Sequence, residues 1–158
     1  APYASEASGF VSVALGYNAK SIGDYSVSIG NRSTASSELT YSFGNHALAA
    51  ANGSISIGNY TETTGANSFA FGEYVKTSNI GNMTIGRGVN SSIKLNNIYP
   101  NSLAIGFNST IPTLFVGASS GAGASTFLGT LTLTSPSVVK IFTFSSPLIH
   151  FPLLALTP

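Results

Sequence analysis

The sequence Ser-Ile-Ser-Ile-Gly at residues 54–58 is one of seven related phrases that follow one another along the chain. Each phrase ends in a glycine. The first six of these glycines are 14 residues apart, and the seventh follows after 20. A fixed period of this length is typical of solenoid proteins, in which each repeat contacts only its neighbours. The sequence therefore predicts an all-β solenoid of 14-residue repeats, whose corner glycines are Gly16, Gly30, Gly44, Gly58, Gly72, Gly86 and Gly106.

Bulky and small residues alternate just before each corner glycine. With that glycine as position 0 of a repeat, positions 11 and 13 are apolar in every copy, whereas positions 10, 12 and 14 are Ser, Thr, Asn, Ala or Gly. This period of two predicts a β-strand with one bulky and one small face. The bulky residues form the predicted structural core, here called the apolar ladder: Val13, Leu15, Val27, Ile29, Tyr41, Phe43, Ile55, Ile57, Phe69, Phe71, Met83, Ile85, Leu103 and Ile105.

Charged residues keep the same register. In the regular repeats they occupy only positions 1, 2, 4 and 8, which we therefore assign to turns and outward sites, because charged side chains avoid burial unless they are paired. Positions 3 and 5 are small and alternate with them, which predicts a second short strand opposite the first. The charged residues are Arg87, Glu73, Arg32, Lys20, Glu62, Lys76, Asp24 and Glu38.

The repeat length limits the number of sides of each coil. Fourteen extended residues at ~3.3 Å each give a perimeter of roughly 46 Å, enough for two short strands and two tight turns but too short for three sides. We therefore expect two facing sheets, one lined by the apolar ladder and the other by small residues. The recurring glycine allows a positive φ or a close backbone approach at the corner. Asn31, Asn45 and Asn59, which follow it, tolerate turn conformations.

Two bulky residues per repeat make a thin core for a single chain. Ordering the backbone costs free energy at every residue, so this composition favours a core that is pooled among several chains. The small strand face would also permit close approach of the chains. We therefore predict an oligomer, specifically a homotrimer.

The phrase Asn-Ser-Leu-Ala-Ile-Gly at 101–106, its variants at 26–30, 54–58 and 68–72, and the 14-residue spacing resemble the head repeats of trimeric autotransporter adhesins, the YadA-like family. The resemblance covers residues 4–106. It implies a left-handed parallel β-roll of three chains on a bacterial surface, and adhesion to host or matrix proteins. It also implies a longer connection before a neck, and the insertion within 91–100 is similar to one.

Other parts of the chain depart from this family. No heptad coiled coil follows the repeats, and no four-stranded membrane anchor with a terminal aromatic residue is visible. The stretch 101–117 also resembles, more weakly, repeat regions of bacterial and phage fibre proteins. The resemblance therefore supports the fold more strongly than the biological setting.

The composition changes after the repeats. We divide the chain into a β-roll at 1–106, a transition with a Gly/Ala/Ser linker at 107–125, and an apolar β segment at 126–158, with strands at 130–134 and 138–144 and a proline-punctuated tail at 147–158. Because solenoids need capped ends, we favour a cap role for this last segment. The alternative is a joint that packs on the next subunit of a filament.

The bulk composition excludes several classes. Charged residues make up only 7% of the 158 residues and the net charge is +1, so nucleic acid is a poor partner. There is no cysteine for a disulfide framework or a thiolate metal site. No signal peptide is visible at the start, which is consistent with processing, and no run approaches the ~20 apolar residues of a membrane-spanning helix.

No residue constellation predicts catalysis, a metal site or a cofactor. His46 occupies a turn position and His150 the apolar tail, in unlike contexts. Asp24 and Glu38 share position 8 and should stack about 5 Å apart. We favour the interpretation that they are two solvated turn residues. The alternatives are a glycosidase pair or a weak cation site. Threonine recurs at no single register, against an ice-binding face. Six Asn-x-Ser/Thr sequons are compatible with surface glycans but are explained by the repeat composition: Asn31, Asn52, Asn59, Asn82, Asn90 and Asn108.

The sequence thus leads to three hypotheses. The first is a non-enzymatic, extracellular adhesive fibre module on a bacterial cell surface, a homotrimer that contacts a host or matrix protein or a glycan through repeated sites. The second is a subunit of a self-assembling filament or a virion tail fibre, joined through the C-terminal segment. The third, an enzyme, lacks any supporting residues.

Overall fold

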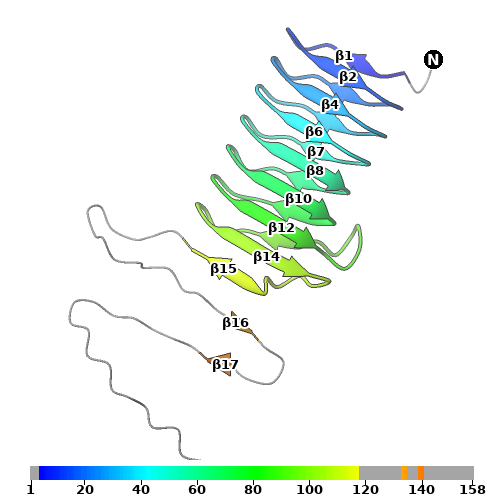
Figure 1. Cartoon of the computed structure of the whole chain (residues 1–158). Coiled ribbons are helices and arrows are strands. Elements are labelled where there is room, and N and C mark those ends of the chain that lie inside the picture. Colours follow the sequence, from blue (N-terminus) through cyan, green and yellow to red (C-terminus); the bar gives the residue numbers. More distant parts are fainter. Residues whose placement is uncertain (1–3, 118–132, 135–138, 141–158) are drawn as a thin grey trace, which may run out of the picture.

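The computed structural model describes residues 4–117, 133–134 and 139–140, and in this part every regular element is a β-strand (Figure 1). Two sheets make up the roll. The first has seven strands: β1 (Glu6–Ala7), β3 (Lys20–Ser21), β5 (Thr34–Ala35), β7 (Leu48–Ala49), β9 (Glu62–Thr63), β11 (Val75–Thr77) and β13 (Leu95–Asn97). The second has eight: β2 (Val13–Leu15), β4 (Val27–Ile29), β6 (Tyr41–Phe43), β8 (Ile55–Asn59), β10 (Phe69–Glu73), β12 (Met83–Arg87), β14 (Leu103–Phe107) and β15 (Leu114–Val116).

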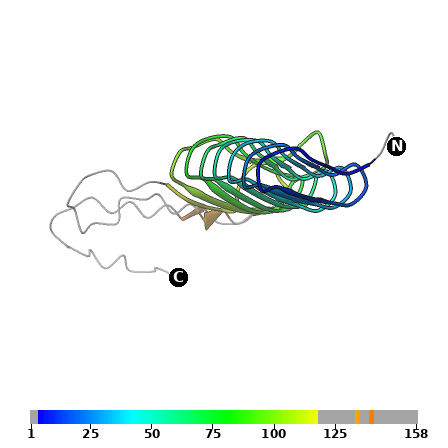
Figure 2. The same cartoon turned by 90° about the horizontal axis from the view of Figure 1, so that it is seen from above.

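The chain alternates between the two sheets, one strand of each per coil. From β1 to β14, neighbouring strands within a sheet are parallel. Residues pair with their equivalents 14 positions away, as Phe71 does with Ile57, and 20 positions away across the insertion, as Leu103 does with Met83. Figure 2 shows the coils as flattened loops stacked one behind another. The predicted parallel β-solenoid of two-sided, 14-residue coils is therefore confirmed.

Small side chains fill the space between the two sheets. Positions 10 and 12 point inward from the eight-stranded sheet and positions 3 and 5 from the seven-stranded sheet; Ser56 and Thr63, for example, are 0% exposed. Hydroxyl groups join the sheets across this space. The Oγ atoms of Ser28 and Ser33 lie 2.8 Å apart, and Ser56 Oγ donates to Thr61 Oγ1 at 2.9 Å. Buried polar groups need such partners, and here they provide them for one another.

The structure differs from the sequence-based prediction about the inner wall. The apolar ladder was expected to line it, but these side chains lie on the outer face of the eight-stranded sheet, where Leu15 is 62% and Phe71 48% exposed. The physical reason is the short repeat: two strands joined by tight turns leave a gap that admits mainly Ser, Ala and Thr. Val75 and Leu95 are the largest apolar side chains it holds.

The two turns of each coil are alike. Residues at positions 2 and 9 adopt a left-handed conformation in successive coils, as His46 (φ 52°) and Leu39 (φ 55°) do. These positions are seven residues apart, so each 14-residue coil consists of two similar halves. Bulky residues rarely adopt a positive φ. The backbone hydrogen bonds between coils on either side of each turn hold these residues in place.

Six of the seven corner glycines share one backbone conformation, with φ between 129° and 134°. They stack directly on one another: a Cβ atom on Gly58 would overlap the carbonyl oxygen of Gly72 in the next coil. Only glycine fits here, because it alone adopts this positive φ without strain and has no Cβ atom to meet the next coil. The seventh, Gly106, does not share the positive φ and precedes the end of the last parallel strand.

The last coil contains the insertion. Its six extra residues lie at 89–94, because Leu95 pairs with Val75, 20 positions earlier. The predicted range 91–100 overlaps this segment but extends into β13. The insertion is closed on itself by Asn90, whose Oδ1 accepts hydrogen bonds from the backbone amides of Ser92 and Ile93 at 3.0 and 2.9 Å.

The eight-stranded sheet continues past the predicted end of the roll at Gly106. β15 pairs antiparallel with β14, and Leu103 lies opposite Val116. The ring of Phe115 lies 5.2 Å from that of Tyr99 in an edge-to-face contact at this end.

Two further strands, β16 (Leu133–Thr134) and β17 (Val139–Lys140), pair antiparallel and fall within the strands expected at 130–134 and 138–144. The predicted linker at 118–125 and the tail at 147–158 lie outside the described residues.

Candidate interaction surfaces

The apolar ladder forms a continuous face on the outside of the eight-stranded sheet. Its residues pair in register from β2 to β14, so that each bulky side chain lies above its equivalent in the next coil. Opposite residues of paired strands share a face, so Leu114 and Val116 of β15 extend this surface past Ile105 and Leu103. A large exposed apolar face of this kind marks an interaction surface.

The opposite wall, formed by the seven-stranded sheet, is polar. At position 4, side chains such as Lys20, Thr34 and Glu62 point outward between inward-facing Ala, Ser and Thr neighbours. The two faces of the roll therefore differ sharply in chemistry.

One edge of the roll carries two ladders at positions 1 and 2. At position 1, Asn45 Nδ2 donates to Asn59 Oδ1 at 2.8 Å, and Asn59 Nδ2 donates to Glu73 Oε1 at 3.0 Å. Arg87 completes this ladder with an ion pair to Glu73 at 2.9 Å. Each side chain thus binds its equivalent one coil away.

At position 2, the rings of His46 and Tyr60 stack with centroids 4.5 Å apart and 6° between their planes. Tyr74 continues the series at 5.8 Å from Tyr60. Stacked rings at a turn rigidify this edge and offer a half-buried aromatic strip.

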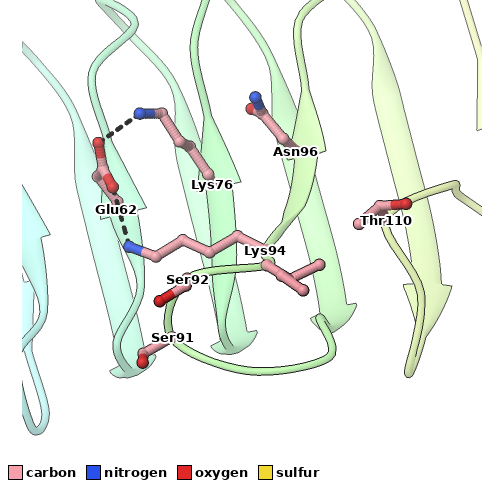
Figure 3. A pocket seen from close by; sticks show the side chains of 8 residues that line it. Glu62, Lys76, Ser91, Ser92, Lys94, Asn96 and Thr110 are labelled. Atoms are coloured by element: carbon pink, nitrogen blue, oxygen red, sulfur yellow. Dashed lines mark hydrogen bonds and ion pairs between the residues drawn. The ribbon is translucent and has the colours of Figure 1, made fainter.

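The insertion creates a hollow on the polar wall (Figure 3). It measures about 410 Å³. Glu62 of β9, Lys76 of β11 and Asn96 of β13 reach it from consecutive strands, and the insertion supplies Lys94 from beside it. The complete lining is Glu62, Lys76, Ser91, Ser92, Ile93, Lys94, Asn96 and Thr110.

Two lysines share one carboxylate in this hollow. Lys76 Nζ lies 2.6 Å from Glu62 Oε1, and Lys94 Nζ lies 2.9 Å from Glu62 Oε2. Burial on its own raises the pKa of Glu62, but the hydrogen bonds and positive charges of Lys76 and Lys94 outweigh it, so the pKa lies below its ordinary value. At neutral pH the cluster therefore carries one net positive charge.

The titratable candidates from the sequence do not converge. His46 stacks on Tyr60 at the turn edge, and His150 lies outside the described residues. Asp24 accepts the backbone amide of Phe10 at 2.8 Å, and Glu38 accepts Asn52 Nδ2 at 3.3 Å. Among the residues that the structure describes, no group of three or more His, Asp or Glu side chains could hold a metal ion.

The sequons are not equivalent in the folded chain. Asn82 is 2% exposed, and its Nδ2 donates to the Asn97 carbonyl at 2.7 Å. A glycan on Asn82 is therefore incompatible with the roll. Asn59 and Asn90 also use their side chains, in the position-1 ladder and in the insertion.

Comparison with known proteins agrees with this geometry. The family model of the YadA head domain repeat matches the chain in two places, at residues 7–33 and 49–73. Both matched segments fall within the regular coils, and each contains two of the stacked corner glycines, such as Gly58 and Gly72. No curated protein matches the chain significantly. In the described part of the chain no helix is long and apolar enough to span a membrane.

Sequence reasoning missed three features of these surfaces. The stacking of His46 on Tyr60 was visible in principle, because both occupy position 2 of consecutive repeats. The pairing of Glu62 with Lys76 likewise follows from their shared position 4. The contact of Lys94 with Glu62 had no sequence signal, because Lys94 belongs to the insertion and lies outside the 14-residue register.

Proposed function

We propose that the chain is the head module of a non-enzymatic, extracellular adhesive fibre, in which three copies pack through their apolar faces. The observation that carries this proposal is the position of the apolar ladder. The interior of the roll is already filled by small side chains, so the bulky residues cannot be buried between the two sheets of their own chain. Packing them against equivalent faces of other copies removes the exposed apolar surface from water.

The resemblance to YadA-like heads supports three copies around one axis and a place on a bacterial cell surface. Such an assembly leaves the polar walls and turn edges outside, each repeated three times. Repeated weak sites on one rigid body bind a host or matrix protein or a glycan by multivalency. The proposal requires no cofactor and no catalytic residue.

The mass of the assembly tests this packing. Light scattering coupled to gel filtration should give three times the chain mass of 16.2 kDa. Phe71→Asp places a charge in the middle of the apolar face and should abolish the trimer. Leu48→Asp is the matched control, because Leu48 of β7 points outward on the polar wall, and this variant should stay trimeric.

Two outcomes would count against the proposal. A Phe71→Asp protein that is still trimeric, with unchanged melting, would show that the apolar face is not the contact. A wild-type protein that is monomeric at all accessible concentrations would remove the reason for covering the face.

A further inference from the structure

At the hollow beside the insertion, the regular 14-residue pattern of the polar wall is interrupted by a concave surface. Its volume of about 410 Å³ lies within the range of small-molecule sites, ~300–1,000 Å³. Elsewhere on this wall, position 4 presents a straight row of side chains. The insertion therefore adds a concave feature to the regular row of position-4 side chains.

The charges in the hollow favour a small anion with a single carboxylate. Lys76 and Lys94 approach the two oxygens of Glu62 from different sides (Figure 3). Each ammonium group has three N–H donors, and the contact with Glu62 uses only part of this capacity. One positive charge remains uncompensated. A divalent cation is disfavoured because, among the described residues that line the hollow, Glu62 supplies the only carboxylate and two ammonium groups already hold it.

The neutral groups favour a ligand that carries hydroxyl groups. Ser91, Ser92 and Thr110 present hydroxyls that can donate or accept hydrogen bonds. Asn96 adds an amide, which is oriented by Ser78 Oγ donating to its Oδ1 at 2.8 Å. Ile93, which is 46% exposed, supplies an apolar patch for the C–H face of a sugar ring.

The loop that contributes Ser91, Ser92 and Ile93 is held in shape by hydrogen bonds of its own. Asn90 Oδ1 holds the amides of Ser92 and Ile93, and the backbone of Ile93 also pairs with that of Val89 and Asn90. A preformed loop lowers the ordering cost of binding.

We propose that this hollow binds the carboxylated sugar unit of an acidic glycan, with Lys94 and Lys76 contacting the carboxylate and the insertion hydroxyls contacting the ring. The biological role of this site rests on the proposed adhesive function, but binding itself is a property of one chain. The hollow is open, so a sugar chain can continue out of it.

The test uses D-glucuronic acid as the probe, titrated into the full chain and followed by amide chemical shifts in NMR. Glucuronic acid should cause saturable shifts at residues 91–94, with a Kd of about 1 mM for a single weak site. Glucose, which has the same ring and no carboxylate, should bind at least about tenfold more weakly, because it lacks the charge-assisted hydrogen bonds.

Three variants separate binding from structure. Lys94→Gln should weaken binding of glucuronic acid about tenfold. Lys20→Gln is the matched control, because Lys20 occupies the same position 4 on β3, three coils away from Glu62, and it should leave the Kd unchanged. Glu62→Gln releases both lysines and should tighten binding, a direction that a purely structural role would not give.

The proposal is overturned if glucuronic acid causes no saturable shifts in wild-type protein, or if Lys94→Gln binds it as wild type does. It is also overturned if glucose or inorganic sulfate shifts the same residues with equal affinity, since the hollow would then be selective for neither charge nor ring. The assembly mass is measured on the same samples, so a failure of the trimer and a failure of the sugar site are distinguishable.

Discussion

The corner glycines give the sharpest test of the fold, because one substitution can be made at two glycines of different geometry. Gly58 has φ 130° and lies in the glycine stack, where a Cβ atom would overlap the carbonyl oxygen of Gly72. Gly53 lies five residues earlier at position 9, with φ 67°. A Cβ atom on Gly53 would overlap the side-chain oxygen of Asn67, which can rotate away, and would lie at ordinary contact distance from the Asn67 Cα atom. Both glycines are to be replaced by asparagine.

The expected losses differ because only one site excludes a side chain. At Gly58, asparagine is forced into a sparsely populated conformation that costs ~1–3 kcal/mol. The overlap with Gly72 would also separate neighbouring strands and break about two ladder hydrogen bonds at ~1 kcal/mol each. We therefore expect Gly58→Asn to lower the free energy of unfolding by about 4 kcal/mol.

Gly53→Asn should lower the free energy of unfolding by less than about 1 kcal/mol, because asparagine tolerates the left-handed region. Asn67 and Asn101 already occupy the equivalent turn position, with φ 52° and 51°. Gly53→Asn is thus the matched control for the loss of glycine and the gain of an amide side chain.

Thermal melting followed by circular dichroism measures the difference, with both variants at one protein concentration because assembly contributes to apparent stability. A loss of 4 kcal/mol corresponds to a shift in melting temperature of roughly 8–16 °C for a chain of 158 residues. Equal shifts in melting temperature for Gly58→Asn and Gly53→Asn would refute the argument. They would show that a side chain is tolerated in the stack of corner glycines as well as it is at Gly53.

Three further predictions follow from other parts of the chain. Because the pKa of Glu62 is lowered by folding from 4.5, its contribution to stability is present above that pH and is lost as the pH falls through the folded pKa. Glu62→Gln should therefore flatten the decline in melting temperature as the pH falls below 4.5. Ala70→Leu should lower the free energy of unfolding by about 1–3 kcal/mol, because Ala70 is 0% exposed between the two sheets, whereas Leu48→Met on the outer wall should leave it unchanged within about 0.5 kcal/mol in urea titrations. Deletion of residues 137–158 separates the two roles of the C-terminal segment: loss of long fibres in electron micrographs with trimers intact indicates a filament joint, and loss of the trimers indicates a cap.

The sequence predicted the coil better than it predicted which face lies inside. The 14-residue spacing fixed the parallel register, because a solenoid must place equivalent residues above one another, as Phe71 lies beside Ile57. Alternation along a strand defines two faces but does not say which of them faces the other sheet. In a monomeric sandwich the bulky face is inside, and this expectation failed here.

The repeat itself nevertheless argued against a bulky interior. Except for Val75 and Leu95, positions 3 and 5 are as small as positions 10 and 12, so the opposing strand offered few large residues to pack against the apolar ladder. The half-period of seven was also visible, because Gly9, Gly23 and Gly65 occupy position 7, midway between corner glycines. The hollow, by contrast, depends on how residues 89–94 fold back, which no periodic pattern encodes.

Specificity and stability come from different faces of this roll. Hydroxyl pairs such as Ser28–Ser33 join the sheets in one register, because a slip would leave buried oxygens without partners. They add little apolar burial, and the free energy from burial scales with apolar area. Most of the bulky apolar surface belongs to the apolar ladder, on the outside of the coil. In the proposed trimer this surface is buried only when the chains associate, so folding and association become one concentration-dependent equilibrium. A substitution on the apolar face should then change the concentration dependence of melting, whereas one in the hydroxyl interior should lower melting at every concentration by a similar amount.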